Sequence, residues 1–167
     1  YREAEKLTEL IGRFLDIRRL KINRSRVDYE LLEVENLLQK AKEGCRDKKE
    51  HNEITVECEA DLQVYGNRKE LTQVITQLLD NACRYSPKAG QITLVASRGA
   101  GETSICVTDH GIGIPQDELE SIFAPFHRLD TGDRRSTGGV GLGLSVTKDI
   151  VALHGGHMQV ESTLGEG

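Results

Sequence analysis

The glycine-rich stretch GGVGLGLSV, residues 138–146, has the composition of a loop that binds a phosphate group. Four glycines lead into an apolar run, which predicts a loop opening a helix, and a helix N-terminus favours an anion through its free N–H groups and its dipole. Arg128, Arg134 and Arg135 precede it and add the positive charge expected of a mobile cover over a phosphate. The loop lacks the lysine of a P-loop and the preceding strand of a dinucleotide fingerprint. Taken alone, a glycine-rich stretch of this kind is more often a linker than a phosphate loop.

The segment from Asn67 to Tyr85 predicts a long amphipathic helix that starts with a capping box, because Asn67 and Glu70 have the N-cap and N3 spacing. Gln77, Asn81 and Arg84 lie away from the centre of its apolar stripe. An asparagine carbonyl oxygen can ligate a hard cation, and an arginine can neutralise phosphate oxygens. The alternative is an ordinary solvated helix face.

The stretch VTDHGIGIP runs from a predicted strand directly into Asp109, followed by Gly111 and Gly113. A carboxylate at a strand end can accept hydrogen bonds from an exocyclic amine. Glycines beside it allow the backbone to approach a flat ligand. Many ordinary turns have the same D-x-G-x-G pattern.

The composition is that of a globular protein large enough for one domain with a core. The chain has 167 residues, 37% hydrophobic and 29% charged, with a net charge of −5 that argues against nucleic acid as a partner. The four cysteines include no C-x-x-C pair, so reduced thiols are expected rather than zinc or a disulfide framework. No apolar run approaches the roughly 18 residues of a membrane span.

The elements that must position these groups follow from periodicity. Helices are expected over residues 1–20, 28–44, 67–85, 116–123 and 141–153, and strands over 53–59, 62–66, 91–99, 103–109 and 157–163. Asp28 is the expected N-cap of the second helix, and the strands at 91–99 and 103–109 are expected to form a hairpin. This order predicts an α/β sandwich with helices on one face of a mixed sheet. The chain begins with Tyr1 inside a predicted helix and stops just after a predicted strand, so we expect a fragment of a longer protein.

Taken in order, five stretches resemble the N, G1, F, G2 and G3 boxes of the sensor histidine kinase catalytic domain: QLLDNACRYSP, DHGIGIP, IFAPFHRLD, GGVGLGLSV and STLGEG. The resemblance implies a Bergerat-type ATP-binding fold, a two-layer α/β sandwich with a mixed, mostly antiparallel sheet. It divides the chain into the end of the second dimerisation helix (1–22), a linker (23–28) and the catalytic domain (29–167).

The resemblance also implies the roles of individual residues. Asn81 is expected to hold Mg²⁺, with Gln77 as a second candidate. Asp109 is expected to accept a hydrogen bond from the adenine amine. Phe123 and Phe126 are expected to anchor the lid. The full set of expected ATP-binding residues is Asn81, Arg84, Tyr85, Asp109, Gly111, Gly113, Ile114, Phe126, Arg128, Gly139, Val140, Gly141, Leu142 and Gly143. His154 precedes a Gly-Gly helix stop, so His154 and His157 are expected to mark a helix end rather than a metal pair.

Gln77 and the histidines then suggest how ATP is used. Related hydrolytic ATPases place Glu at the position of Gln77, and a carboxamide cannot act as a general base. The resemblance therefore implies phosphoryl transfer to a histidine on the dimerisation helix, followed by transfer to a response-regulator aspartate. None of the five histidines here has the context of that acceptor. We expect a fragment with no catalytic residue of its own that binds ATP but does not autophosphorylate alone.

The implied partners are the protein's own phosphoacceptor and dimerisation domain, a response-regulator receiver domain and, at full length, a second copy of the chain. The need for ATP implies a bacterial cytoplasmic domain. Two alternatives remain at this point. One is a serine kinase of the anti-sigma type, against which the apolar helix over residues 1–20 counts. The other is a signalling module that has lost nucleotide binding, for which Gln77 is the best support.

Overall fold

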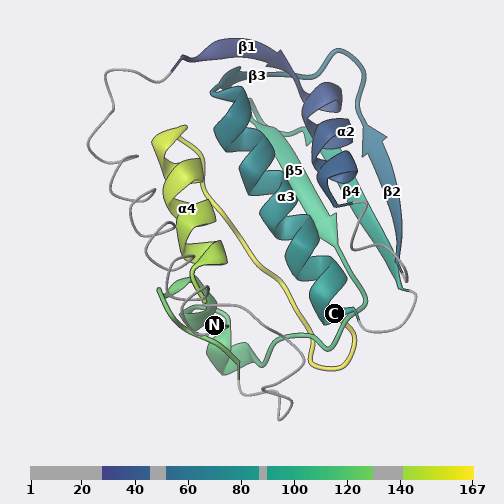
Figure 1. The fold of residues 1–167 in the computed structure, drawn as a ribbon, viewed down its shortest axis with the longest axis vertical. Coiled ribbons are helices and arrows are strands. Elements are labelled where there is room, and N and C mark those ends of the chain that lie inside the picture. Colours follow the sequence, from purple (N-terminus) through teal and green to yellow (C-terminus); the bar gives the residue numbers. More distant parts are fainter. Residues whose placement is uncertain (1–27, 46–51, 87–89, 130–140) are drawn as a thin grey trace, which may run out of the picture.

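The computed structural model describes residues 28–45, 52–86, 90–129 and 141–167, which form two layers, a layer of helices against a layer of strands (Figure 1). The expected dimerisation helix and most of the expected linker lie outside these residues. The described helices are α2 (Val34–Gly44), α3 (Arg68–Tyr85) and α4 (Gly143–Leu153). None of them is long and apolar enough to cross a membrane.

Helix α3 begins where the sequence predicts, because its cap is local. The Asn67 side chain accepts a hydrogen bond from the Glu70 N–H at 3.0 Å, which is the first half of the predicted capping box. The second half is not made by Glu70. The Asn67 N–H donates instead to Nε2 of His154, 3.1 Å away.

The strands form two sheets. β1 (Glu30–Glu33) pairs antiparallel with β3 (Gln63–Gly66), and β4 (Gln91–Arg98) lies between β2 (Glu53–Cys58) and β5 (Thr103–Thr108). β4 pairs parallel with β2 and antiparallel with β5, which confirms the predicted hairpin and the mixed α/β sandwich. Alternate residues of the larger sheet point at the helices, among them Ile92, Leu94 and Ala96, which are at most 2% exposed.

Two apolar clusters meet along α3. The larger one joins α2, the strands and one side of α3, where Ile75, Leu79 and Ala82 are buried. The smaller one joins Val74 and Leu78, on the adjoining side of α3, to Leu142, Val146 and Ile150 around α4. Helix α3 therefore packs against both the sheet layer and α4, which lie on different sides of it (Figure 1).

The prediction of one helix from Asp28 to Gly44 is wrong at its start. Residues 30–33 form β1, in which Glu30 lies opposite Gly66 and Glu33 opposite Gln63. The helix begins at Val34, whose N–H donates to the Leu62 carbonyl at 3.0 Å. The partner strand is about thirty residues away in sequence, so helical periodicity alone could not reveal it.

Two further elements differ from the prediction. The expected helix after Pro115 is a pair of single 3₁₀ turns, η3 (Gln116–Glu118) and η4 (Ser121–Phe123), and the chain becomes extended at Ala124 (ψ 138°). The expected strand at 157–163 has strand-like alternation but no ladder hydrogen bonds to any described strand, so it is not a strand here. A strand exists only where a neighbour pairs with it.

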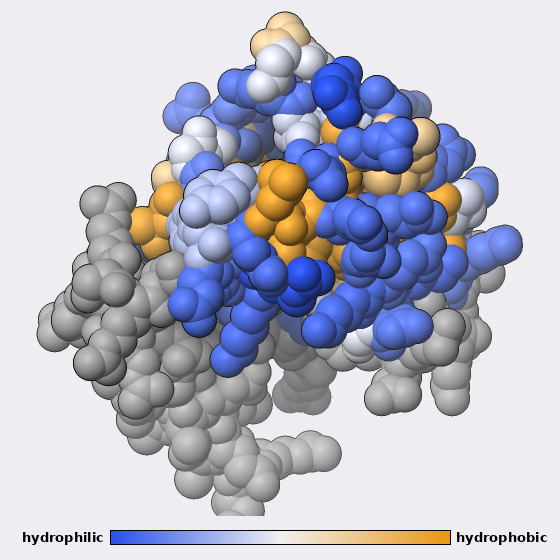
Figure 2. All heavy atoms as spheres, turned by 90° about the horizontal axis from the view of Figure 1, so that it is seen from above, coloured by the Kyte–Doolittle hydropathy of each residue, from blue (hydrophilic) through white to orange (hydrophobic). Residues whose placement is uncertain are grey.

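The outer face of the β1–β3 pair carries an apolar patch. Leu31 and Tyr65 lie directly opposite each other in the register and are 62% and 64% exposed. Figure 2 views this end of the molecule and shows a small group of hydrophobic atoms within a mostly hydrophilic surface.

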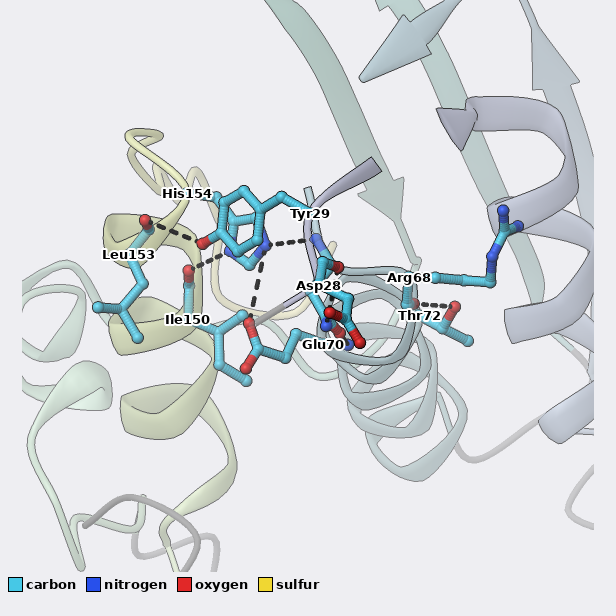
Figure 3. A network of polar contacts seen from close by, with 9 residues as sticks. Asp28, Tyr29, Arg68, Glu70, Thr72, Ile150, Leu153 and His154 are labelled. Atoms are coloured by element: carbon cyan, nitrogen blue, oxygen red, sulfur yellow. Dashed lines mark hydrogen bonds and ion pairs between the residues drawn. The ribbon is translucent and has the colours of Figure 1, made fainter. Parts of the chain in front are cut away.

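His154, at the C-cap of α4, connects α4 to the start of α3 and to Tyr29, which directly precedes β1 (Figure 3). Its ring stacks on Tyr29 at 4.9 Å, and its Nε2 accepts the Asn67 N–H. The ring proton therefore lies on Nδ1, which donates to the Ile150 carbonyl at 2.8 Å. The Tyr29 hydroxyl donates to the Leu153 carbonyl at 3.3 Å. His154 is thus a structural residue at a helix end, as the sequence predicts.

Replacing His154 with alanine is expected to destabilise the domain by about 2–4 kcal/mol, because it leaves the Asn67 N–H without its partner and opens a cavity beside Tyr29. His157→Ala is the matched control, since the His157 side chain is 63% exposed. We expect that control to stay within about 0.5 kcal/mol of the wild type. Urea unfolding followed by circular dichroism measures both, and equal stabilities for the two variants would contradict the role assigned to His154.

Candidate functional site

Two carboxamides lie one turn apart on α3 and contact each other. Gln77 Nε2 donates to Asn81 Oδ1 at 3.2 Å, and both side chains are partly exposed. An amide oxygen has two lone pairs, so Asn81 Oδ1 keeps one for another ligand while it accepts from Gln77. Arg84 is exposed in the last turn of the same helix. The face that the sequence singled out thus exists, and its two amides are brought together.

The start of α4 packs directly onto this pair. A Cβ at Gly143 would lie 2.6 Å from Nε2 of Gln77, so the glutamine carboxamide occupies the space that a side chain at 143 would need. Leu142, only 2% exposed, anchors the loop in the smaller apolar cluster. Among the described residues, no side chain caps the N-terminus of α4. Its first N–H groups are therefore available to an anion beside Gln77 and Asn81.

The segment after η4 is tied to the glycine loop through its backbone. The Phe126 N–H donates to the Gly141 carbonyl at 2.9 Å, and both residues have positive φ, 65° and 75°. The Phe126 side chain is 60% exposed, so in this structure its backbone, not its ring, makes the anchor. The Phe123 ring lies 4.9 Å from Nζ of Lys148 on α4. Arg128 is exposed, while Gly139 and Val140 lie outside the described residues.

Asp109 follows β5 and is held at one of its two carboxylate oxygens. Oδ1 accepts the Gly111 N–H at 2.8 Å and the Ser86 hydroxyl at 3.3 Å. Both donors act on the same atom, so within the described part of the chain Oδ2 remains available to a ligand. Ser86 is the C-cap of α3, five residues beyond Asn81, so one helix carries both ends of the site.

The two glycines after Asp109 are required by close packing against the protein's own backbone. A Cβ at Gly111 would lie 2.5 Å from the Tyr85 carbonyl oxygen, and one at Gly113 (φ 67°) would lie 2.1 Å from the Thr163 carbonyl oxygen. Ile112 is held from both sides: its N–H donates to Tyr85 O at 3.2 Å, and its carbonyl accepts from Gly165 N at 2.8 Å. Sequence reasoning attributed these glycines to ligand approach alone.

Ser86 and Ser162 are site residues that sequence reasoning missed. Ser162 Oγ accepts the Ile114 N–H at 2.8 Å and donates to the Gly167 carbonyl at 3.1 Å, which fastens the loop after Asp109 to the C-terminal segment. Ser86 lies within one of the matched boxes, but only the fold shows that its hydroxyl meets Asp109. Tyr85 contributes through its carbonyl oxygen, which no side-chain pattern indicates.

Comparison with known families assigns the fold. The family described as histidine kinase-, DNA gyrase B-, and HSP90-like ATPase matches residues 66–167, more than half of the chain. The chain belongs to this family. The circadian input-output histidine kinase CikA of Synechococcus elongatus is 34% identical over 98% of this chain and 22% of its own length. The sensor-like histidine kinase SenX3 of Mycolicibacterium smegmatis is 30% identical over 99% of this chain and 44% of its own length.

Solved structures agree. Full-length ShkA in complex with AMPPNP matches 99% of this chain and 35% of its own, with a TM-score of 0.83 and 25% identity. The mycobacterial sensor histidine kinase MprB matches 77% of this chain and 81% of its own, with a TM-score of 0.67 and 29% identity. Within its family, the chain corresponds to the ATP-binding catalytic domain of sensor histidine kinases. It spans less than half the length of these curated relatives.

Gly143→Ala is expected to weaken ATP–Mg²⁺ binding by roughly tenfold, about 1.4 kcal/mol, because the new methyl group displaces the Gln77 carboxamide beside Asn81. The stability should change little, since alanine favours a helix and the displaced group is a flexible side chain. Gly44→Ala is the matched control, because a Cβ there meets only Thr76 at an ordinary 3.8 Å. Fluorescent ATP-analogue titration and thermal unfolding measure both variants. A Gly143→Ala protein that unfolds would show that the loop is primarily structural.

Proposed function

We propose that this domain binds ATP with Mg²⁺ and donates the γ-phosphoryl group to a histidine on a dimerisation helix, from which it passes to a response-regulator aspartate. The observation that carries the proposal is the arrangement along α3. Asn81 lies beside the start of α4, and Asp109 is held by Ser86, five residues beyond Asn81 at the end of α3. This order suits a nucleotide with its phosphates at α4 and its purine at Asp109.

The donors present suit Mg²⁺. Magnesium prefers oxygen ligands, retains several waters and takes others from substrate phosphates, so one protein oxygen is sufficient. Asn81 Oδ1 is that oxygen, and Gln77 orients it through the 3.2 Å hydrogen bond. When bound, the ion neutralises charge on the phosphate oxygens. Gln77 is assigned to positioning the Asn81 amide rather than to direct coordination.

The remaining ATP contacts belong to the same proposal. The N–H groups at the start of α4, from Gly141 to Gly143, receive the phosphates, and Arg84 and Arg128 add positive charge. Gly139 and Val140 belong to the same proposed loop. On the purine side, Asp109 accepts a hydrogen bond from the adenine amine, Tyr85 lies against the nucleotide, and Ile114 contributes to the wall. Phe126 borders the phosphate end, beside Gly141.

Phosphoryl transfer to a histidine fits better than hydrolysis. The imidazole nitrogen attacks the γ-phosphorus, a P–N bond forms, the bond to the β–γ bridging oxygen breaks, and ADP leaves. This reaction depends mainly on positioning and charge. Hydrolysis needs a base to activate water, and the carboxamide of Gln77 cannot serve as one. Full-length relatives are sensor kinases, which supports a dimer that supplies the acceptor helix and a receiver-domain partner.

Transfer is tested with γ-labelled ATP and Mg²⁺. The 167-residue chain alone is expected to bind ATP but to retain no label, whereas a chain extended upstream through its acceptor helix should gain acid-labile phosphate. Replacing that acceptor histidine with glutamine should remove the label. Label on the chain alone, or acid-stable phosphoserine on a separate protein, would contradict the proposal. The second result would favour the anti-sigma type of serine kinase.

Asp109→Asn is expected to weaken ATP binding by about tenfold or more, because its neutral amide is a poorer acceptor for the adenine amine. Titration of a fluorescent ATP analogue, with Mg²⁺ and with a chelator, measures this loss together with the contribution of the metal. Asp117→Asn, an exposed carboxylate in η3, is the control and should bind as the wild type does. A wild-type chain without measurable ATP affinity would favour a nucleotide-free signalling module.

A further inference from the structure

Ser86 is the last residue before the chain leaves α3, and it is buried at 3% exposure. Its N–H caps the helix by donating to the Ala82 carbonyl at 3.0 Å. Its hydroxyl donates to Oδ1 of Asp109. We propose that Ser86 is the positioning residue for purine recognition: it fixes the Asp109 carboxylate so that Oδ2 faces the exocyclic amine of adenine. This inference rests on the proposed function, because it assumes that Asp109 receives the purine.

The burial of Ser86 makes its contact with Asp109 obligatory. A hydroxyl shielded from water needs a hydrogen-bond partner, and among the described residues its acceptor is Asp109 Oδ1. The distance of 3.3 Å is longer than that of most O–H···O bonds. The contact is therefore a weak hydrogen bond in this structure.

Two donors on one carboxylate oxygen determine which way the group faces. The Gly111 N–H, at 2.8 Å, and the Ser86 hydroxyl approach Oδ1 from different segments of the chain. A carboxylate held by a single donor can still turn about its last side-chain bond. A carboxylate held by two donors from different segments presents the same oxygen to every ligand, which lowers the entropic cost of binding.

The position of Ser86 on α3 also links the two ends of the site. The same helix carries Asn81 five residues earlier, and the carbonyl of Tyr85, between the two, accepts the Ile112 N–H. Asp109 itself belongs to the segment after β5. The Ser86 hydroxyl thus ties the purine carboxylate to the helix that carries the proposed metal ligand, without touching the nucleotide.

The test compares two nucleotides: ATP and purine riboside 5′-triphosphate, which lacks only the 6-amino group. The wild-type chain should prefer ATP by about tenfold, the worth of one hydrogen bond to a charged group. Ser86→Ala should reduce that preference to roughly threefold or less while leaving the affinity for purine riboside triphosphate unchanged. Ser86→Thr keeps a hydroxyl and should restore the preference. Ser104→Ala, at an exposed serine on β5, should bind both nucleotides as the wild type does.

Equal weakening of both nucleotides by Ser86→Ala, or an unchanged preference, would overturn the inference, because a purely structural serine does not distinguish the amine. A wild type with no preference for ATP would overturn the proposed role of Asp109, and the inference with it. Ser86→Cys, which keeps the volume but donates weakly, provides the same comparison if the alanine variant does not fold. If neither variant folds, Ser86 is a structural residue and the inference fails.

Discussion

The packing of α3 on two sides is the constraint on which the rest of the structure depends. One side of the helix closes the core over the sheet, where Leu79 is fully buried, and the adjoining side holds α4 through Val74 and Leu78. The polar face with Gln77 and Asn81 adjoins the side that holds α4, on the side away from the core, so it lies beside the first turn of α4. The positions of Gln77 and Asn81 therefore follow from apolar packing, and no separate scaffold is needed to align them.

The accuracy of the sequence predictions follows the distance over which each feature is determined. The cap of α3 was predicted because Asn67 and Glu70 are three residues apart, and the reciprocal partner was missed because His154 is 87 residues away. Helical periodicity likewise predicts that α2 includes residues 30–33, which form β1 in the structure. A strand this short can be recognised only from the strand it pairs with, β3, which is distant in sequence. The alternation at 157–163 predicts a strand, but no described strand pairs with this segment. An alternating pattern alone does not show whether a pairing partner exists.

The candidate site was predictable in its residue types but not in its contacts. Amides on a helix face, a carboxylate after a strand and glycines before a helix could all be read from the sequence. The fold alone places Ser86 against Asp109 and the Thr163 carbonyl against Gly113. The Thr163 contact explains why residue 113 is a glycine even when no ligand is considered. Loss of that glycine would therefore affect folding as well as binding.

The hydrogen bond between Phe126 and Gly141 has a consequence for how such domains can vary in length. This bond joins Phe126 to Gly141, the residues on either side of the connection over 127–140. The distance between the two ends of that connection is therefore fixed. Closing a longer connection costs only about 0.6 kcal/mol for each doubling of its length. Insertions between Phe126 and Gly141 should therefore cost little stability. Related chains can differ in the length of this connection and keep the same arrangement of α3 and α4.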